Sequence, residues 1–325
     1  MRSTASCFLD PKSVVVVGVS HDKYKIGRII FDQLINQERI TFGINPNFKS
    51  NHHRQIFTDI SLLPYPAELA VYAVPADIGL SEIEKAARLG IKNHLILSSG
   101  FKEIGKEGMA REEKLLNLIK KYHLNVQGPN CLGNISPVFN TNISFGKTPL
   151  KGNIGLILQS GAIGTAFLDW ATEQDIGISH FVSLGNKINL SENEFLEFQG
   201  HDKSTKVIGL YLENIRAPEQ FLKLAFEIAK KKPIVVLHAG KTKESRMAIS
   251  SHTGALAGSF ASAEAALAQV GIIEASDLQQ FFILLELLSH DFPKQLPETL
   301  VITNAGGPSV LLTDNLSTHG FRSYQ

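Results

Sequence analysis

Two glycine-containing segments of the chain stand where helices are expected to begin, and one of them carries a histidine. They are residues 159–164 (QSGAIG) and residues 250–258 (SSHTGALAG), with His252 near the start of the second helix. A helix N-terminus offers unpaired backbone N–H groups and the positive end of the helix dipole to an anion. If the two helix ends face each other, they would stabilise a phosphoryl group attached to the imidazole, so His252 is a candidate covalent nucleophile.

A nucleophilic imidazole needs an acceptor that fixes its second ring nitrogen. Glu213 directly follows the predicted strand 206–212, at the end of a parallel strand where such an acceptor could lie. Two simpler interpretations stay open, because most single histidines are structural or solvated, and because Glu213 could instead cap a helix. The small-residue pattern around His252 favours the catalytic interpretation.

The turn after the first predicted strand has the composition of a phosphate site. Gly18 and Gly27 enclose it, and a helix follows, so the backbone could approach a ligand closely. The second strand ends in Ile44-Asn45-Pro46 without an acid for a ribose 2′-OH, which disfavours NAD. A ligand with phosphates and a different ribose environment would suit this turn, with Lys49 or Arg54 meeting a ribose phosphate. The alternative is a glycine turn made for packing.

A third motif, residues 128–133 (GPNCLG), follows the last predicted strand of the first series. Open α/β sheets bind ligands at the carboxyl ends of their strands, so this turn is a candidate ligand contact. Asn130 could orient a ligand. Cys131 is more often a small buried hydrophobe than a nucleophile.

Between these motifs, β-branched runs alternate with amphipathic stretches. This alternation predicts two α/β domains with parallel sheets. In the first domain we expect strands at residues 13–19, 40–44, 69–74, 94–98 and 124–127, and helices at residues 27–37, 76–89 and 106–122. In the second we expect strands at residues 153–159, 177–182, 206–212 and 233–238, and helices at residues 162–172, 218–231, 259–270 and 276–289. The polar segment 141–152 predicts a boundary between a domain of residues 1–145 and one of residues 150–292.

Residues 298–325 open a third α/β pattern, with a strand at 300–303 and a helix at 309–318. One strand and one helix cannot bury a parallel-sheet core, so this domain is expected to be truncated. The alternative is that its strand adds to the sheet of the second domain.

Composition narrows the function classes. The 325 residues carry 32 Lys and Arg against 31 Asp and Glu, and this balance disfavours binding to nucleic acid or an anionic membrane. No apolar run approaches the length of a membrane span, and no export signal is recognised. Cys7 and Cys131 lie too far apart for a Cys-x-x-Cys site, and no metal site is expected. We expect a soluble cytoplasmic protein.

The ordered motifs VVVVGVS, GINPNFK, SSGFKEIG, GPNCLG, GLILQSGAIGTA, VSLGNKINL, LYLENI and SHTGALAG together resemble the NDP-forming acyl-CoA synthetases. The similarity covers essentially the whole chain and is strongest to the α side of ADP-forming acetyl-CoA synthetase, with succinyl-CoA synthetase more distant. It implies a Rossmann-like CoA-binding domain, a flavodoxin-like domain bearing a phosphohistidine, and the start of a second flavodoxin-like domain.

The resemblance also implies roles for residues. His252 would carry the phosphoryl group and Glu213 would steady its imidazole. The phosphate would be bound by Ser160, Gly161, Ala162, Thr253 and Gly254. The candidate CoA-binding residues are Gly18, Ser20, Lys23, Ile26, Gly27, Asn45, Pro46, Lys49, Val74, Pro75, Asn130 and Cys131.

The expected reaction is reversible ligation of a small carboxylic acid to CoA through an acyl phosphate, coupled to ADP and ATP. The family uses an ATP-grasp domain with Mg²⁺ for the nucleotide step, and nothing in this sequence resembles one. An ATP-grasp domain or subunit is therefore an expected partner, and we expect an oligomer. His238 stands where relatives often have lysine. The alternatives are a non-catalytic CoA-binding regulatory module, a scaffold part of a protein acetyltransferase, or an NAD-dependent oxidoreductase.

Overall fold

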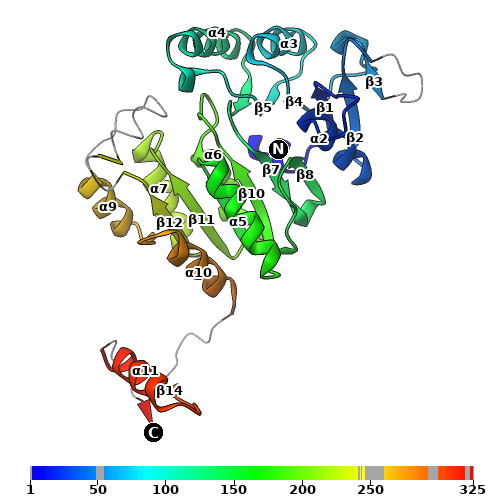
Figure 1. Ribbon diagram of the computed structural model, residues 1–325. Coiled ribbons are helices and arrows are strands. Elements are labelled where there is room, and N and C mark those ends of the chain that lie inside the picture. Colours follow the sequence, from blue (N-terminus) through cyan, green and yellow to red (C-terminus); the bar gives the residue numbers. More distant parts are fainter. Residues whose placement is uncertain are drawn as a thin grey trace. The chain divides into compact units, whose positions relative to one another are not determined.

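The computed structural model describes residues 2–48, 55–240, 242, 244–245, 260–291, 299–318 and 323–324. The chain divides into two units, Met1–Ser289 and His290–Gln325, which are considered separately. The first unit contains two α/β sheets with their helices (Figure 1).

Within the described residues, the first sheet has six parallel strands in the order β3-β2-β1-β4-β5-β6. Its strands are β1 (Ser13–Val17), β2 (Ile40–Ile44), β3 (Ile56–Phe57), β4 (Leu69–Tyr72), β5 (Asn93–Ile96) and β6 (Asn125–Gln127). Its helices are α1 (Thr4–Leu9), α2 (Ile26–Asn36), α3 (Ala76–Arg88) and α4 (Lys106–Tyr122), with short 3₁₀ turns η1 (Ile60–Leu62) and η2 (Lys102–Ile104).

Alternating side chains of β1 explain the two layers of helices. Val14 and Val16 pack in the cluster that contains Ile30 of α2, whereas Val15 and Val17 pack in the cluster that contains Ile83 of α3. A strand apolar on both faces must be covered on both faces. Figure 1 shows α3 and α4 side by side on one of them.

The second sheet, counted over the described residues, has seven strands in the order β13-β12-β11-β9-β10-β7-β8, and β7 and β8 are antiparallel. Its strands are β7 (Gly133–Ser136), β8 (Thr141–Ser144), β9 (Lys151–Leu158), β10 (Ile178–Ser183), β11 (Val207–Leu212), β12 (Ile234–His238) and β13 (Ile273–Glu274). Its helices are α5 (Gly161–Glu173), α6 (Glu192–His201), α7 (Pro218–Ala229), α9 (Phe260–Gln269) and α10 (Leu278–Ser289), and η3 (Pro137–Phe139) joins β7 to β8.

The two sheets divide the chain earlier than the sequence suggests. Strands β7 and β8 hydrogen-bond into the second sheet, although the polar segment 141–152, which begins with β8, predicts the boundary near residues 145–150. A single hydrophobic cluster also joins the sheets, with Phe8 of α1 and Phe195 of α6 in edge contact at 6.3 Å between ring centroids.

The second unit contains α11 (Gly306–Thr318) and a parallel pair formed by β14 (Thr299–Leu300) and β15 (Ser323–Tyr324). Within this unit β14 pairs with β15, and the alternative that the strand adds to the sheet of the second domain stays a prediction. No helix within the described ranges is both long and apolar enough to cross a membrane.

Candidate functional site

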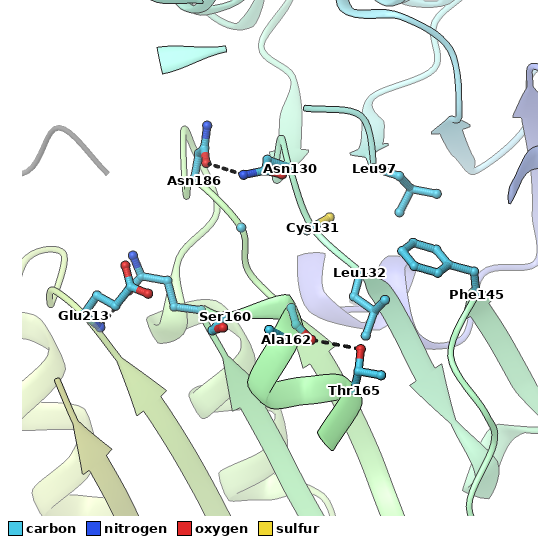
Figure 2. A pocket seen from close by; sticks show the side chains of 13 residues that line it. Leu97, Asn130, Cys131, Leu132, Phe145, Ser160, Ala162, Thr165, Asn186 and Glu213 are labelled. Carbon is cyan, nitrogen blue, oxygen red and sulfur yellow. Dashed lines mark hydrogen bonds between the residues drawn. The ribbon is translucent and has the colours of Figure 1, made fainter. Parts of the chain in front are cut away.

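A cavity of about 450 Å³ lies where the segments after β6, β9, β10 and β11 meet (Figure 2). These are carboxyl ends of parallel strands, where open α/β sheets bind ligands. The cavity is lined by Leu97, Asn130, Cys131, Leu132, Phe145, Gln159, Ser160, Gly161, Ala162, Thr165, Gly185, Asn186 and Glu213. Three motifs that are far apart in the sequence therefore share one site.

The first turn of α5 forms the floor of this cavity. Ser160 is the N-cap, and its hydroxyl oxygen accepts the backbone N–H of Ile163 at 3.3 Å. Gly161 and Ala162 follow it and line the cavity. The first N–H groups of a helix have no partner within the helix, so this turn offers donors and a positive dipole end to an anion.

Glu213 lies on the other side of the cavity from Thr165 in Figure 2. Its backbone N–H donates to Gln159 Oε1 at 3.0 Å, and that of Asn214 donates to the same oxygen at 3.4 Å. Burial, together with the negative charge of Glu213 and a hydrogen bond to it, raises the pKa of Tyr211 to about 12. The backbone at Glu213 is thus fixed by Gln159, the residue that follows β9.

A buried ion pair supports the loop that carries Glu213. Lys187 Nζ lies 2.9 Å from Glu192 Oε2 and donates to the Asn214 carbonyl at 2.6 Å. Burial lowers the pKa of Lys187, while the carboxylates of Glu192 and Glu213 oppose that shift. The second carboxylate oxygen of Glu192 accepts the backbone N–H of Arg216. The loop after β11 is therefore fixed at two of its peptide groups.

The GPNCLG turn reaches the cavity from the first sheet. Asn130 adopts a left-handed conformation, with φ of 59°, and its side chain donates to Asn186 Oδ1 at 3.5 Å (Figure 2). Asn186 in turn donates to Glu103 Oε2 at 2.6 Å. Cys131 donates its thiol to the Ile96 carbonyl, and burial raises its pKa to about 12. It is a neutral thiol near pH 7, as expected of a small buried hydrophobe.

In the glycine turn between β1 and α2, the backbone at Gly18 and the backbone at Gly27 lie close to each other. Gly18 has φ of 103°, and a Cβ there would lie 2.6 Å from Val74 Cγ1. A Cβ on Gly27 would lie 2.3 Å from the Gly18 carbonyl oxygen. Asn45 donates from its side chain to the Val19 carbonyl at 2.6 Å. The backbone between β1 and α2 is thereby held against the loops after β2 and β4.

The remaining predicted residues of this turn lie at the same sheet edge and do not line the cavity. Ser20 accepts the N–H of Asp22 at 3.1 Å, Lys23 lies 5.1 Å from the Tyr24 ring centroid, and Pro75 is the N-cap of α3. Ile26 begins α2 and Pro46 follows β2 by two residues. His252, Thr253, Gly254 and Lys49 lie outside the described residues, so their roles stay predictions.

Sequence reasoning missed part of the cavity wall. Asn186 lines the cavity and Lys187 supports the loop that carries Glu213; both belong to the VSLGNKINL motif, from which no site residue is predicted. Phe145 falls in the segment interpreted as a domain boundary. Gln159 is a candidate that the sequence displays, because a polar side chain buried at the end of a strand nearly always has a hydrogen-bond partner. Leu132 and Thr165 lie within the motifs GPNCLG and GLILQSGAIGTA without a predicted role, and Leu97 lies in none of the motifs.

Comparison with known proteins places both halves of the first unit. Residues 12–137 match a family model for a CoA binding domain, and residues 151–288 match one for a succinyl-CoA ligase like flavodoxin domain. The chain is 35% identical over 322 residues to the α subunit of the ADP-forming acetate–CoA ligase I of Pyrococcus furiosus, which covers 97% of this chain and 70% of that subunit.

Two further relatives agree. The chain is 36% identical to the ADP-forming acetate–CoA ligase I of Archaeoglobus fulgidus, over 95% of its own length and 45% of that enzyme, so it spans about half of that relative. The dinucleotide-forming acetyl-coenzyme A synthetase 1 of Candidatus Korarchaeum cryptofilum, in complex with phosphate and ADP, superimposes with a TM-score of 0.90 at 34% identity, over 98% of this chain and 70% of that one.

The α/β class, with a parallel CoA-binding sheet followed by the mixed sheet of a succinyl-CoA ligase like domain, agrees with the fold predicted from the sequence. The chain belongs to the NDP-forming acyl-CoA synthetase family, on the side of the ADP-forming acetate–CoA ligase α subunits.

Proposed function

We propose that this chain is the CoA-binding and phosphoryl-carrying part of an ADP-forming acyl-CoA synthetase that joins a small carboxylic acid to CoA. The observation that carries the proposal is the cavity in which the start of α5, Glu213 and Asn130 converge. An anion-binding helix end beside a carboxylate that can orient an imidazole is what a phosphohistidine relay needs.

In the proposed relay, His252 carries the phosphoryl group. A carboxylate oxygen of the acid attacks phosphorus while the N–P bond breaks, which gives an acyl phosphate and a neutral imidazole. The CoA thiolate then attacks the acyl carbon. The new C–S bond replaces the C–O bond to phosphate, and inorganic phosphate leaves. The relay splits one difficult transfer into two easier ones and is reversible.

Each part of the site has a task in this scheme. The N–H groups of Gly161 and Ala162, with Ser160 and the segment at Thr253 and Gly254, would stabilise the phosphoryl oxygens. Glu213 would accept a hydrogen bond from the imidazole and stabilise its positive charge. The CoA phosphates would lie at the turn between β1 and α2, with the pantetheine arm running past Val74 to Asn130.

Exchange of phosphate with ATP or ADP would need Mg²⁺ and an ATP-grasp domain or subunit. The Pyrococcus relative is named an α subunit, and this supports a second subunit as the partner of the present chain.

The test uses half-reactions that need no nucleotide. Acetyl phosphate is the probe, because it can phosphorylate the histidine and can also acylate CoA. We expect the purified chain to acquire an acid-labile, base-stable phosphoryl group and to form acetyl-CoA from acetyl phosphate and CoA, while ATP, acetate and CoA yield none. His252→Ala should lose the phosphoryl group and keep its melting temperature.

Three outcomes would contradict the proposal. CoA binding without phosphorylation or acetyl-CoA formation indicates a regulatory or scaffold module. Tighter calorimetric binding of NAD than of CoA indicates an oxidoreductase. Undiminished phosphorylation of His252→Ala indicates that another residue carries the phosphoryl group.

A further inference from the structure

The cavity has two chemically different sides (Figure 2). Glu213, Ser160, Asn130 and Asn186 supply polar groups, whereas Leu97, Leu132 and Phe145 face the cavity from the opposite direction. We call these last three residues the apolar wall. The first turn of α5 lies between the two sides, so a molecule that places an anion on that turn can direct an apolar group to the wall.

The three wall residues come from separate segments and differ in exposure. Leu97 follows β5 and Leu132 precedes β7, and both are buried. Phe145 follows β8 and leaves 43% of its surface exposed. Removing apolar surface from water is favourable, so an aromatic ring that remains half open opposite two buried leucines would gain from an apolar ligand.

The ring is presented by a turn with its own support. Asn142 is 1% exposed, and its side-chain oxygen accepts the N–H of Ser144 at 2.8 Å. Its amide donates to the Gly146 carbonyl at 3.2 Å and to Thr148 Oγ1 at 2.7 Å. One buried side chain therefore holds the backbone before and after Phe145. A ligand that packs on the ring meets a surface already in position.

The volume points the same way. At about 450 Å³, the cavity falls within the roughly 300–1,000 Å³ typical of sites for drug-sized ligands. A phosphoryl group, a thiol and a methyl group would leave much of that space unfilled. A larger hydrocarbon group could occupy it beside the apolar wall.

We propose that Leu97, Leu132 and Phe145 bind the acyl group, and that the preferred acid is apolar and bulkier than acetate, with a branched or cyclic hydrocarbon group. The inference rests on the proposed function, because the carboxylate must lie beside the phosphoryl group at the start of α5 for its hydrocarbon part to reach the wall. Phe145 is the specificity-determining residue, since it is the open member of the three.

The test measures binding of CoA thioesters to the full chain by calorimetry and needs no partner subunit. The probes are CoA, acetyl-CoA and isovaleryl-CoA. We expect isovaleryl-CoA to bind at least fivefold more tightly than acetyl-CoA. Phe145→Ala should remove most of that preference and leave CoA affinity within twofold. Phe145→Leu, which keeps an apolar side chain, should retain most of it.

Phe226→Ala is the matched control. Phe226 lies on α7, is 45% exposed, and does not line the cavity. Phe226→Ala should leave the affinities for CoA, acetyl-CoA and isovaleryl-CoA unchanged. Melting temperatures of all variants separate lost binding from lost folding.

The outcomes separate this inference from the proposed function. Equal binding of acetyl-CoA and isovaleryl-CoA by the wild-type chain would overturn the inference while leaving CoA ligation intact. An equal loss for all three probes in Phe145→Ala would also overturn it, because the wall would then contact the pantetheine arm. Failure of CoA itself to bind would overturn the proposed function, and the inference with it.

Discussion

Gln159 and Glu213 are joined by a hydrogen bond of 3.0 Å from the backbone nitrogen of Glu213 to Gln159 Oε1. Gln159 follows β9 and Glu213 follows β11, and these strands are parallel neighbours. Ser160, the next residue, caps α5. The same short segment thus fixes both the first turn of α5 and the backbone of Glu213, which follow strands spaced by roughly 4.8 Å.

Replacing Gln159 should disturb that arrangement. Gln159→Met keeps the length of the side chain but leaves the N–H groups of Glu213 and Asn214 without their acceptor, which should cost about 1–3 kcal/mol in unfolding free energy. Phosphorylation by acetyl phosphate should fall at least tenfold. Gln159→Glu keeps an acceptor and should be milder in stability. Urea unfolding that leaves Gln159→Met as stable as the wild type would contradict this account.

The close approach of Gly18 and Gly27 between β1 and α2 leads to a second prediction. Gly27→Ala would place a Cβ against the Gly18 carbonyl, so we expect a loss of about 1–3 kcal/mol and weaker CoA binding. Gly79→Ala on α3 is the control, because its Cβ would lie 3.9 Å from Val74 Cγ2 in ordinary contact. It should be neutral or stabilising by up to about 1 kcal/mol. Thermal unfolding and CoA calorimetry measure both variants. Equal stability and equal CoA affinity of Gly27→Ala and Gly79→Ala would contradict the expected clash at Gly27.

Tyr211 provides a spectroscopic reporter for Glu213. Burial and the neighbouring carboxylate hold the pKa of the phenol at about 12. Glu213→Gln removes the negative charge that disfavours tyrosinate, so the pKa of Tyr211 should fall while burial keeps it above 10. Ultraviolet difference titration against Tyr211→Phe isolates this residue from the other tyrosines. An unchanged titration in Glu213→Gln would mean that the carboxylate does not act on the phenol.

Asp202 should make stability depend on pH in the acid range. Burial alone would raise the pKa of this carboxyl, but hydrogen bonds from His180 and Thr205 outweigh it, and the pKa falls to about 2. A lowered carboxyl pKa contributes stability that is present above about pH 4 and is lost as the pH falls through 2. The contribution is about 2 kcal/mol.

Asp202→Asn should therefore be less stable than the wild type at pH 6 and should lose less stability on acidification from pH 4 to 2. Urea unfolding at a series of pH values measures both slopes. Parallel slopes for the two proteins would assign the acid sensitivity to other carboxyl groups.

The sequence was most informative where a single physical pattern decides the structure. Residues 14–17 are four valines, and a run apolar on both faces identifies a central parallel strand, as β1 proves to be. Strands β7 (GNIS) and β8 (TNIS) were missed because their buried Asn and Ser residues are polar, and their burial depends on bonds to distant partners. Asn134, for example, pairs with Gln127 of the other sheet.

Among the site residues, too, some follow a pattern that the sequence displays and others do not. Ser160 and Glu213 were predictable because each follows an apolar strand, and strand ends define the ligand edge of an α/β sheet. Phe145 and Leu97 were not, since no local pattern tells an apolar residue that faces a cavity from one that faces a core. Helix α6 was also missed, although Ser191 and Glu194 form a capping box that the sequence displays.

The edge contact between Phe8 and Phe195 lies in a core that continues from one sheet into the other. Moving the sheets apart would expose this core to water, so hinge bending between them is an energetically unfavourable way to admit a substrate. The β1–α2 turn belongs to one sheet and the start of α5 to the other, so the shared core sets the separation between these two places. A ligand that spans both places would have to match the separation that this core sets.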